Sequence, residues 1–237
     1  MNTNKLYIPG AIVLAGIIIA GAMIYSGNLS SDPQTAKVSD SVLKNDPSVP
    51  KEEYLKPISS EDHILGNLSA PIKIVEYSDT ECPFCKNFHL TMHQVVEEYG
   101  GQVAWVYRHF PLPQLHPKAP KQAEATECAA ELGGNDAFWN YIDRIFKITP
   151  SNNGLDMALL PEIAEYVGLD RGSFQECLDS GRHEQKIADD YNSAVESGGR
   201  GTPFSIIISK DGKKTVIPGT LPYSSIKSVI DKILQEE

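Results

Sequence analysis

The sequence predicts an α/β domain that carries a long helical insertion and follows an N-terminal membrane span and a flexible tether. Three observations lead to this prediction. Residues 71–107 follow a strand–helix–strand pattern, which is typical of a βαβ unit with parallel pairing. Residues 117–199 have a helical period throughout, after which strand patterns return. Residues 8–25 are almost wholly apolar and carry no charge.

Length and composition are those of a globular protein. The chain has 237 residues, of which 41% are hydrophobic and 22% charged, so it is neither disordered nor collagen-like and is long enough for one core without disulfide staples. The net charge of −10 leaves no basic surplus to neutralise phosphates, which argues against nucleic acid as a partner. Four cysteines are enough for one reactive pair and one structural bridge.

The apolar run Ile8–Tyr25 predicts a membrane anchor or a signal over residues 1–25. Eighteen residues at about 1.5 Å each come close to the hydrocarbon thickness of a bilayer. Lys5 precedes the run and Asp32 is the first charge after it, so we expect the N-terminus inside and the remainder exported. A cleaved signal competes with an uncleaved anchor, because Ala20–Ala22 is a small-x-small triplet. A buried core helix is disfavoured, since the run is terminal and has no polar face.

Residues 26–57 are predicted to be a flexible linker. They contain four prolines and six serines and show no sustained period of 2 or 3.6. A flexible segment of this length spans roughly 30 Å on average, which would hold a folded domain at 58–237 close to a membrane surface.

The folded region begins with strand, helix and strand. Pro71–Tyr77 alternates with β-branched residues, as a strand does. Helical spacing follows the Cys82–Cys85 segment and stops at Gly100–Gly101, and Val103–Tyr107 is a second apolar strand. The helix is expected to bury one apolar face, formed by Phe88, Met92, Val95, Val96 and Tyr99.

The helical insertion is predicted over about 114–199. Its first helix is Ala119–Leu132, and Asn135 is expected to cap the next one. After the insertion, residues 203–208 and 214–217 are predicted strands that flank an Asp211–Gly212 turn typical of a hairpin. Pro222 is expected to open a closing amphipathic helix. The remaining insertion helices are marked by Phe138, Ile142 and Ile145; by Leu159, Ile163 and Val167; by Phe174, Cys177 and Leu178; and by Ile187, Tyr191 and Val195.

Reactive chemistry is predicted at Cys82 and Cys85. A thiol at a helix N-terminus lies beside unpaired backbone N–H groups and the positive end of the helix dipole, which stabilise its thiolate. The second thiol, one turn along, can attack a mixed disulfide and release the partner. Pro83 suits the first turn, because that position needs no N–H donor.

Two other uses of these cysteines remain open at this point. Cys82, Cys85 and His89 form a C-x2-C-x3-H spacing, with His93 one turn further on, that could begin a zinc site. Structural zinc sites usually close with a second, distant ligand pair, and the sequence offers no such pair. A purely structural Cys82–Cys85 disulfide is the other alternative, although so small a loop constrains the unfolded chain little. His89 and His93 are assigned no role.

From about Ile58 to Glu237 the sequence resembles the DsbA-like thiol:disulfide oxidoreductases of the thioredoxin superfamily. The resemblance rests on several independent stretches in the family's order, and it implies a thioredoxin-like fold with an inserted all-helical subdomain. These stretches are Ile74–Asp79, Cys82–Cys85, Arg108–Leu112, Phe138–Trp139 in the insertion, and Gly201–Pro203 entering a strand.

The resemblance implies roles for five further residues. Thr202–Pro203 would be a cis-proline loop that docks an extended substrate beside the cysteines, whereas an ordinary proline at a strand start is trans. Glu76 would be a buried acid that relays protons to the resolving thiol; the alternative is a half-exposed strand carboxylate. Pro83 and Phe84 would lie in the substrate-binding surface. Phe84 departs from the family, whose best-known oxidants have a thiolate-stabilising His there, so the direction of net electron flow stays open.

The resemblance also favours a second disulfide, between Cys128 and Cys177. Some relatives with this insertion have such a bridge, and disulfides persist in exported proteins. Closing a loop of about 50 residues would stabilise the fold by roughly 4 kcal/mol in the chain-entropy model. Two unpaired buried thiols are the alternative.

The resulting hypothesis is an exported, membrane-tethered enzyme that forms disulfides in secreted or cell-envelope proteins. Cys82 would be the nucleophile and Cys85 the resolving thiol, with no cofactor or metal. The expected partners are reduced or unfolded secreted proteins and a membrane re-oxidase of the DsbB or VKOR type, and the chain is expected to be a monomer. If the signal is cleaved, the protein would instead be secreted or periplasmic. The alternatives are a reductase or isomerase using the same cysteines, or a membrane-tethered, chaperone-like binding protein.

Overall fold

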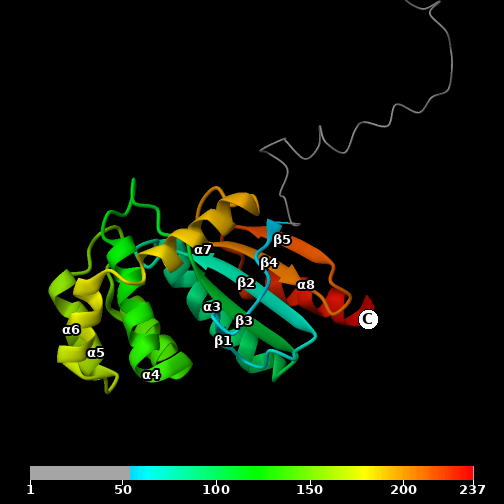
Figure 1. Ribbon diagram of the computed structural model, residues 1–237. Helices are drawn as coiled ribbons and strands as arrows, with labels where there is room; N and C mark the ends of the chain where they lie inside the picture. Colours follow the sequence, from blue (N-terminus) through cyan, green and yellow to red (C-terminus); the bar gives the residue numbers. More distant parts are fainter. Residues whose placement is uncertain (1–53, 237) are drawn as a thin grey trace, which may run out of the picture. The chain divides into compact units, whose positions relative to one another are not determined.

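The computed structural model describes residues 54–236, which contain a five-stranded sheet with the strand order β1-β3-β2-β4-β5. Helices cover the sheet and form a group at one end of it (Figure 1). In chain order the elements are β1 (His63–Leu65), β2 (Ile72–Ser78), α3 (Pro83–Tyr99), β3 (Val103–His109), α4 (Ala119–Ile148), η3 (Met157–Leu159), α5 (Leu160–Tyr166), α6 (Arg171–Ser180), α7 (Glu184–Glu196), β4 (Phe204–Ile208), β5 (Lys214–Pro218) and α8 (Tyr223–Glu236).

The central strand β2 joins the two halves of the sheet. It runs parallel to β3, as the strand–helix–strand pattern predicted, and antiparallel to β4. Glu76 of β2 therefore lies between Tyr107 of β3 and Ser205 of β4. The predicted hairpin joins β4 to β5. A short edge strand that the sequence did not reveal, β1, pairs antiparallel with β3.

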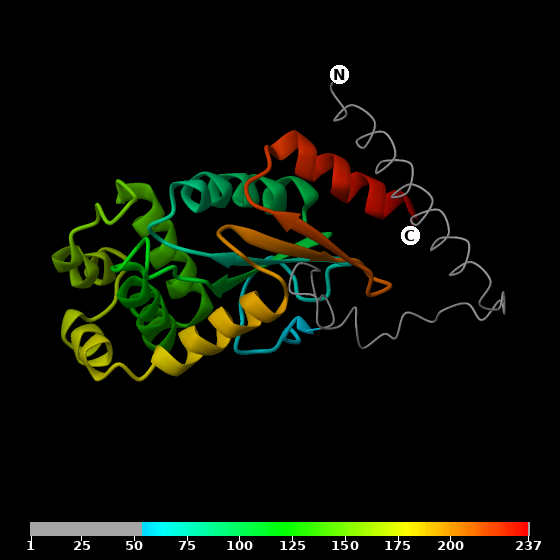
Figure 2. The ribbon, with the colours of Figure 1, turned by 90° about the horizontal axis from the view of Figure 1, so that it is seen from above.

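Helices cover both faces of the sheet. In Figure 2, α3 and α8 lie on one face and α7 on the other. The strands alternate accordingly: Ile74 and Trp105 pack beneath α3 with Phe88 of that helix, whereas Val75 and Val106 face the opposite side. The β2 strand is buried on both faces, which is the arrangement expected of a strand at the centre of an α/β sheet.

Of the helices inserted between β3 and β4, α4, α5 and α6 share an apolar core of their own, whereas α7 packs on the sheet. Tyr141 and Phe174 stack there with ring centroids 5.3 Å apart. The buried side chains of α4, α5 and α6 that surround them are Ala125, Cys128, Ala129, Ile145, Leu160, Ile163, Ala164, Cys177 and Leu178. The helical insertion predicted at about 114–199 corresponds to these elements.

One local prediction inside the insertion was right and one was wrong. The helix Ala119–Leu132 ends where expected, because α4 consists of two helices that meet at a kink, where Gly134 has the non-helical angles φ 75° and ψ −166°, a conformation open to glycine because it lacks a Cβ. Asn135 does not cap the following turns. Its side chain accepts from the Ile64 amide (3.0 Å) and donates to the Ile64 carbonyl (2.9 Å), and so fastens α4 to β1.

Packing against the domain begins before residue 58, the boundary predicted from composition. Leu55 is 8% exposed, and the carbonyls of Lys56 and Pro57 accept hydrogen bonds from Arg108 at 2.8 and 3.1 Å. The Arg108 side chain has no exposed surface and also pairs with Asp62. A buried guanidinium needs such partners, and it draws the end of the predicted linker onto the sheet.

The predicted membrane segment at 8–25 and most of the predicted linker lie outside the described residues. Among residues 54–236, no helix combines the length and apolar character needed to cross a bilayer.

Candidate active site

The two cysteines lie at the start of α3. Cys82 is the N-cap residue, with extended backbone angles of φ −76° and ψ 122°, and Pro83 opens the helix. Cys85 follows in the first turn and is completely buried, whereas Cys82 keeps 5% of its surface exposed. Both thiols are free, so the structure is that of the reduced protein. The outer sulfur is the one that a partner can reach.

Buried carboxylates brace the turn that leads into α3. Asp79 accepts from the Leu112 amide at 2.8 Å and from His116 Nδ1 at 3.0 Å. Glu81 accepts from the Asn153 amide at 2.6 Å and from the Gln122 side chain on α4. These bonds join the cysteine turn to the insertion and fix its position relative to the helices around it.

The Thr202–Pro203 loop faces the outer cysteine. The peptide bond between these residues is cis, so the ordinary trans alternative does not apply. The Cys82 sulfur lies 3.4 Å from the Thr202 carbonyl oxygen, to which the protonated thiol can donate, and this contact spans 120 residues of sequence. Segments far apart in the chain, the start of α3 and the start of β4, thus form one surface.

The electrostatics of the site favour a thiolate on Cys82. Hydrogen bonding from the Cys85 thiol lowers the pKa of Cys82 to about 6, assisted by the Thr202 hydroxyl and the amides of Cys85 and Phe84, while partial burial opposes the shift. The Thr202 hydroxyl makes no well-formed hydrogen bond among residues 54–236, so it is free to turn toward the sulfur. At neutral pH Cys82 is therefore mostly ionised.

The inner thiol has the opposite environment. Complete burial raises the pKa of Cys85 well above its ordinary value, and the charges on Cys82 and Glu76 add to this effect. The Asp79 amide, 3.5 Å from the Cys85 sulfur, is its hydrogen-bond donor. The pair thus consists of one thiolate and one protonated thiol.

Glu76 is fully buried on β2, which excludes the half-exposed strand carboxylate considered from the sequence. Burial raises the pKa of Glu76 to about 8; the nearby Ser78 hydroxyl and Trp105 indole N–H offset only part of this, and the charge on Cys82 raises the pKa further. Neither carboxylate oxygen makes a well-formed hydrogen bond within the described residues. Glu76 is therefore a protonated carboxylic acid at neutral pH, electrostatically linked to both cysteines.

The surface around Cys82 is apolar and open. Phe84 is 62% exposed, and its carbonyl accepts from the Thr220 hydroxyl at 3.1 Å, so α3 is tied to the loop after β5. Thr202 and Pro203 line a pocket of about 420 Å³ with Arg200, Val216 and Pro218 among its other walls. Pro83, Phe84, Thr202 and Pro203 therefore lie beside the reactive sulfur, as the resemblance implied.

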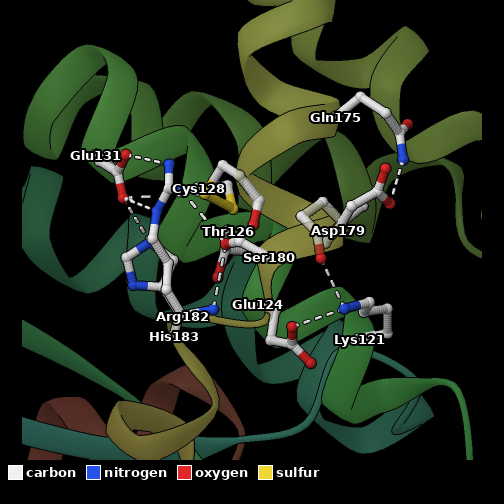
Figure 3. Close-up of a disulfide and its surroundings, with 12 residues drawn as sticks. Lys121, Glu124, Thr126, Cys128, Glu131, Gln175, Asp179, Ser180, Arg182 and His183 are labelled. Atoms are coloured by element: carbon white, nitrogen blue, oxygen red, sulfur yellow. Dashed lines mark hydrogen bonds and ion pairs between the residues drawn. A yellow bond between two sulfur atoms is a disulfide. The ribbon is translucent and has the colours of Figure 1, made fainter.

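Cys128 and Cys177 form a disulfide that joins α4 to α6. Both half-cystines are 1% exposed, and the Arg182 guanidinium pairs with Glu131 beside them (Figure 3). The alternative of two unpaired buried thiols does not apply. The bridge lies within the core of the insertion and does not take part in the reactive pair.

The zinc arrangement considered from the sequence does not form. Within residues 54–236, the groups of side chains close enough to share a metal ion do not include Cys82 or Cys85. His89 and His93 instead approach Asp143 of α4. The sequence did not connect these residues, because Asp143 is 50 positions from His93 and no spacing rule spans two helices.

Comparisons with known proteins agree with this site. A family model described as "Thioredoxin" matches residues 59–232. The chain is 30% identical to Pseudomonas aeruginosa DsbA2, with a TM-score of 0.63, 75% of this chain and 97% of that one being covered. For Wolbachia pipientis alpha-DsbA1 the identity is 26% and the TM-score 0.66, with 78% and 96% covered.

A curated relative from Salinispora tropica is much longer. It carries the name "Na(+)/H(+) antiporter NhaA 3" and is 38% identical over 142 residues, which are 60% of this chain and 21% of that protein. The chain therefore spans about a fifth of the length of this relative. The family match and the solved structures, taken with the Cys82–Cys85 site, place the chain among the DsbA-like thiol:disulfide oxidoreductases of the thioredoxin superfamily.

Proposed function

We propose that this chain is an exported oxidase that introduces disulfide bonds into secreted or cell-envelope proteins by exchange at Cys82 and Cys85. The observation that carries the proposal is the asymmetry of the pair. The accessible sulfur has a pKa lowered to about 6, and the inner one has a pKa raised well above its usual value. A thiol with a low pKa is a good leaving group, and a stabilised reduced form makes the disulfide form more oxidising.

The reaction starts from the Cys82–Cys85 disulfide. A substrate thiolate attacks the Cys82 sulfur, the Cys82–Cys85 bond breaks, and Cys85 leaves as a thiolate. A second substrate thiolate then attacks the substrate sulfur of the mixed disulfide and expels the Cys82 thiolate. The substrate loses two electrons and gains a disulfide, while the enzyme gains both electrons as the reduced pair.

Glu76 is suited to supply the proton for the first step. Cys85 leaves into a fully buried site, where an unpaired charge is costly. The Glu76 carboxyl is protonated at neutral pH because its pKa is raised to about 8, and it interacts electrostatically with Cys85. Transfer of its proton to the departing thiolate, directly or through water, would neutralise Cys85 and leave the carboxylate to be reprotonated from solvent.

Substrate recognition is proposed to use the Thr202–Pro203 loop. An extended peptide can pair with the backbone at the start of β4, as β-strand addition does elsewhere. The exposed Phe84 ring and the pocket of about 420 Å³ beside Pro203 would receive its side chains. Reduced or unfolded proteins fit such an open and largely apolar surface better than folded ones.

The direction of electron flow is testable through the reduction potential. A Cys82 pKa of about 6 lies between the values of about 7 for thioredoxin and about 3.5 for DsbA. We therefore expect a potential between about −270 mV and about −120 mV, the values of those two proteins. Equilibration with glutathione, followed by separation of the oxidised and reduced forms, measures it. A potential at or below that of thioredoxin would indicate a reductase.

Activity assays separate an enzyme from a binding protein. The wild type should oxidise a reduced dicysteine peptide, and Cys82→Ser should lose both this activity and insulin reduction. Cys85→Ser should accumulate mixed disulfides with disulfide-containing protein substrates, because its Cys82 thiolate attacks the substrate disulfide, one substrate sulfur leaves as a thiolate, and no second enzyme thiol releases the other. If Cys82→Ser kept the ability to suppress aggregation and the wild type had no redox turnover, the protein would be a chaperone-like binder instead.

Export and membrane tethering are proposed from the apolar run at 8–25 and the charges around it. The Cys128–Cys177 disulfide supports an oxidising compartment. After each cycle the reduced pair must be re-oxidised, for which we propose a membrane re-oxidase of the DsbB or VKOR type. An anchor would hold a monomeric domain and this enzyme at one surface and so raise their effective concentration.

A further inference from the structure

Three potential metal ligands meet between the active-site helix α3 and the insertion helix α4. His89 and His93 lie one turn apart on α3, and both Nε2 atoms approach Asp143 Oδ1 on α4, at 2.7 and 2.8 Å. The two Nε2 atoms are 3.2 Å from each other. None of the three residues takes part in the thiol exchange described above.

Hydrogen bonding alone does not satisfy this cluster. If both Nε2 atoms carry protons, two N–H groups crowd one carboxylate oxygen from nitrogens only 3.2 Å apart. If either nitrogen is bare, its lone pair faces the carboxylate. With Nε2 protonated, moreover, His89 Nδ1 is a buried acceptor that has no partner within residues 54–236. A metal cation bound by the three atoms would accept the lone pairs of both nitrogens and of the carboxylate oxygen, so that none of them would face another lone pair.

The distances are close to those of a transition-metal site. Zinc binds imidazole nitrogen and carboxylate oxygen at about 2.0–2.2 Å, which places tetrahedral ligands about 3.3 Å apart. The two Nε2 atoms already have nearly this spacing, at 3.2 Å, whereas the separations of 2.7 and 2.8 Å from Asp143 Oδ1 are those of hydrogen bonds, so Asp143 would move outward by about 0.5 Å to bind an ion. Two histidines at positions i and i+4 of a helix lie on the same face and commonly supply two of the ligands of a zinc site.

The surroundings orient the ligands before any ion arrives. The His89 ring packs 4.5 Å from Phe146 and 5.1 Å from Trp105, measured between ring centroids, and the His93 ring packs 5.4 Å from Trp105. His89 is 3% exposed, while His93 and Asp143 are 36% and 40% exposed. Fixed rings keep the donor atoms in place, and the two exposed ligands leave a route for the ion.

The cluster opens on a pocket that can hold a fourth ligand. The pocket has a volume of about 470 Å³ and is lined by Lys86, His89, Leu90, His93, Asp143, Phe146 and Lys147. The ammonium group of Lys86 is occupied by the Thr149 carbonyl at 2.6 Å. We propose that His89, His93 and Asp143 bind a divalent transition-metal ion of the zinc class, with water or a small anion at the open position.

Such an ion would join the catalytic helix to the insertion. The imidazole donors favour zinc, copper, nickel or iron over calcium and magnesium, which prefer oxygen ligands. The site is separate from the reactive sulfurs, since neither Cys82 nor Cys85 lies close enough to the three ligand atoms to share an ion with them. Metal binding therefore tests a property of this chain that does not depend on the direction of thiol exchange.

The experiment uses the full chain with Cys82→Ser and Cys85→Ser, so that free thiols cannot take the metal. After chelation and removal of bound ions, calorimetric titration with Zn²⁺ should give one equivalent per chain. Co²⁺ should produce the d–d absorption of nitrogen and oxygen ligation without a sulfur-to-cobalt charge-transfer band. Zn²⁺ at 100 times its Kd should raise the Tm by roughly 5 °C.

The variants remove the two partly exposed ligands, whose loss the fold should tolerate. His93→Ala and Asp143→Asn should each weaken Zn²⁺ binding at least about 100-fold and abolish the Tm rise. His183→Ala, which removes a histidine from the Glu131 cluster, and Gln94→Ala on the exposed side of α3 should bind as the parent does. Absence of stoichiometric Zn²⁺ uptake or of a Tm rise in the parent would overturn the proposal, as would binding that survives both ligand variants.

Discussion

The two thiols of the pair differ because one opens a helix and the other lies inside its first turn. The Cys85 thiol, the Thr202 hydroxyl and backbone amides near Cys82 lower its pKa, whereas complete burial beside negative charges raises the pKa of Cys85. Each thiol therefore reinforces the ionisation state of the other. The low pKa of Cys82 comes from short-range donors that single substitutions can remove.

Removing the Thr202 hydroxyl should weaken the thiolate. Thr202→Val keeps the shape of the side chain but loses a donor to Cys82, so we expect the Cys82 pKa to rise by about one unit and the protein to become a weaker oxidant. The rate of iodoacetamide alkylation as a function of pH measures the shift. Thr202→Ser should restore the original midpoint, and an unchanged midpoint in Thr202→Val would show that this hydroxyl does not stabilise the sulfur.

Glu76 should lower stability at neutral pH. Its pKa is about 8 in the folded protein, against about 4.3 in the unfolded chain. Below about pH 4.3 the carboxyl is neutral in both states and costs no stability. As the pH rises from there towards 8, the carboxyl ionises only in the unfolded chain, so the free energy of unfolding falls. Glu76→Gln removes this loss, so the reduced variant should be more stable than wild type by roughly 3–4 kcal/mol at pH 7.

Denaturant unfolding of both reduced proteins at several pH values between 5 and 8 provides the measurement. The difference in unfolding free energy should grow with pH, while Glu97→Gln, an exposed position on α3, should leave the pH dependence as it is. A constant difference across this range would contradict a raised pKa for Glu76.

The sequence predicts the role of single residues where reactive residues lie a few positions apart in one motif. The positions and the inequality of Cys82 and Cys85 follow from a C-x-x-C at a strand-to-helix junction. The sequence implied that Thr202 faces Cys82 only through the family resemblance, since the two residues are 120 positions apart in the chain. The convergence of His93 with Asp143 had no signal at all, because it depends on how α3 and α4 pack.

At the scale of elements, the active-site turn is braced against the insertion. Asp79 and Glu81 accept hydrogen bonds from Leu112, His116, Gln122 and Asn153. The insertion therefore contributes to the position of the cysteines as well as to the surface around them. Its own rigidity depends in part on the bridge between α4 and α6.

Removal of that bridge should destabilise the fold without stopping the exchange chemistry. The disulfide closes a loop across a sequence separation of 49, so Cys128→Ala with Cys177→Ala should lower the unfolding free energy by roughly 4 kcal/mol in the chain-entropy model. Chemical denaturation measures the loss, and peptide oxidation below the unfolding transition should continue. A loss below about 1 kcal/mol would mean that the bridge contributes little to stability.

The predicted helices and strands were correct where the apolar period continued over many residues. The prediction failed where a contact with a distant part of the chain determined the local structure. The helices and strands around the site followed from apolar spacing and glycine stops. The three-residue β1 is too short for a period, and Asn135 bonds the Ile64 backbone because the folded chain brings β1 beside it. The local sequence predicts that Asn135 caps a helix, but its side chain instead bonds the backbone of Ile64, which is 71 positions away in the chain.

At the scale of the whole molecule, the domain is one part of a chain with an apolar N-terminus. We predict that the full chain stays in the membrane fraction after alkaline extraction and is released by detergent, because eighteen uncharged residues can span a bilayer. A protein recovered in the soluble exported fraction, with an N-terminus after residue 22, would show instead that the segment is a cleaved signal.

The charge on the Cys82 sulfur determines how the pair reacts, and direct titration of Cys82 measures it. The reduced chain carrying Cys85→Ala is unsuitable, since the Cys85 thiol is the main stabiliser; the wild type, followed by thiolate absorbance with Cys82→Ser as the blank, is the right sample. We predict a midpoint at about pH 6. A midpoint at about 8.5, the value of a free cysteine, would contradict the account.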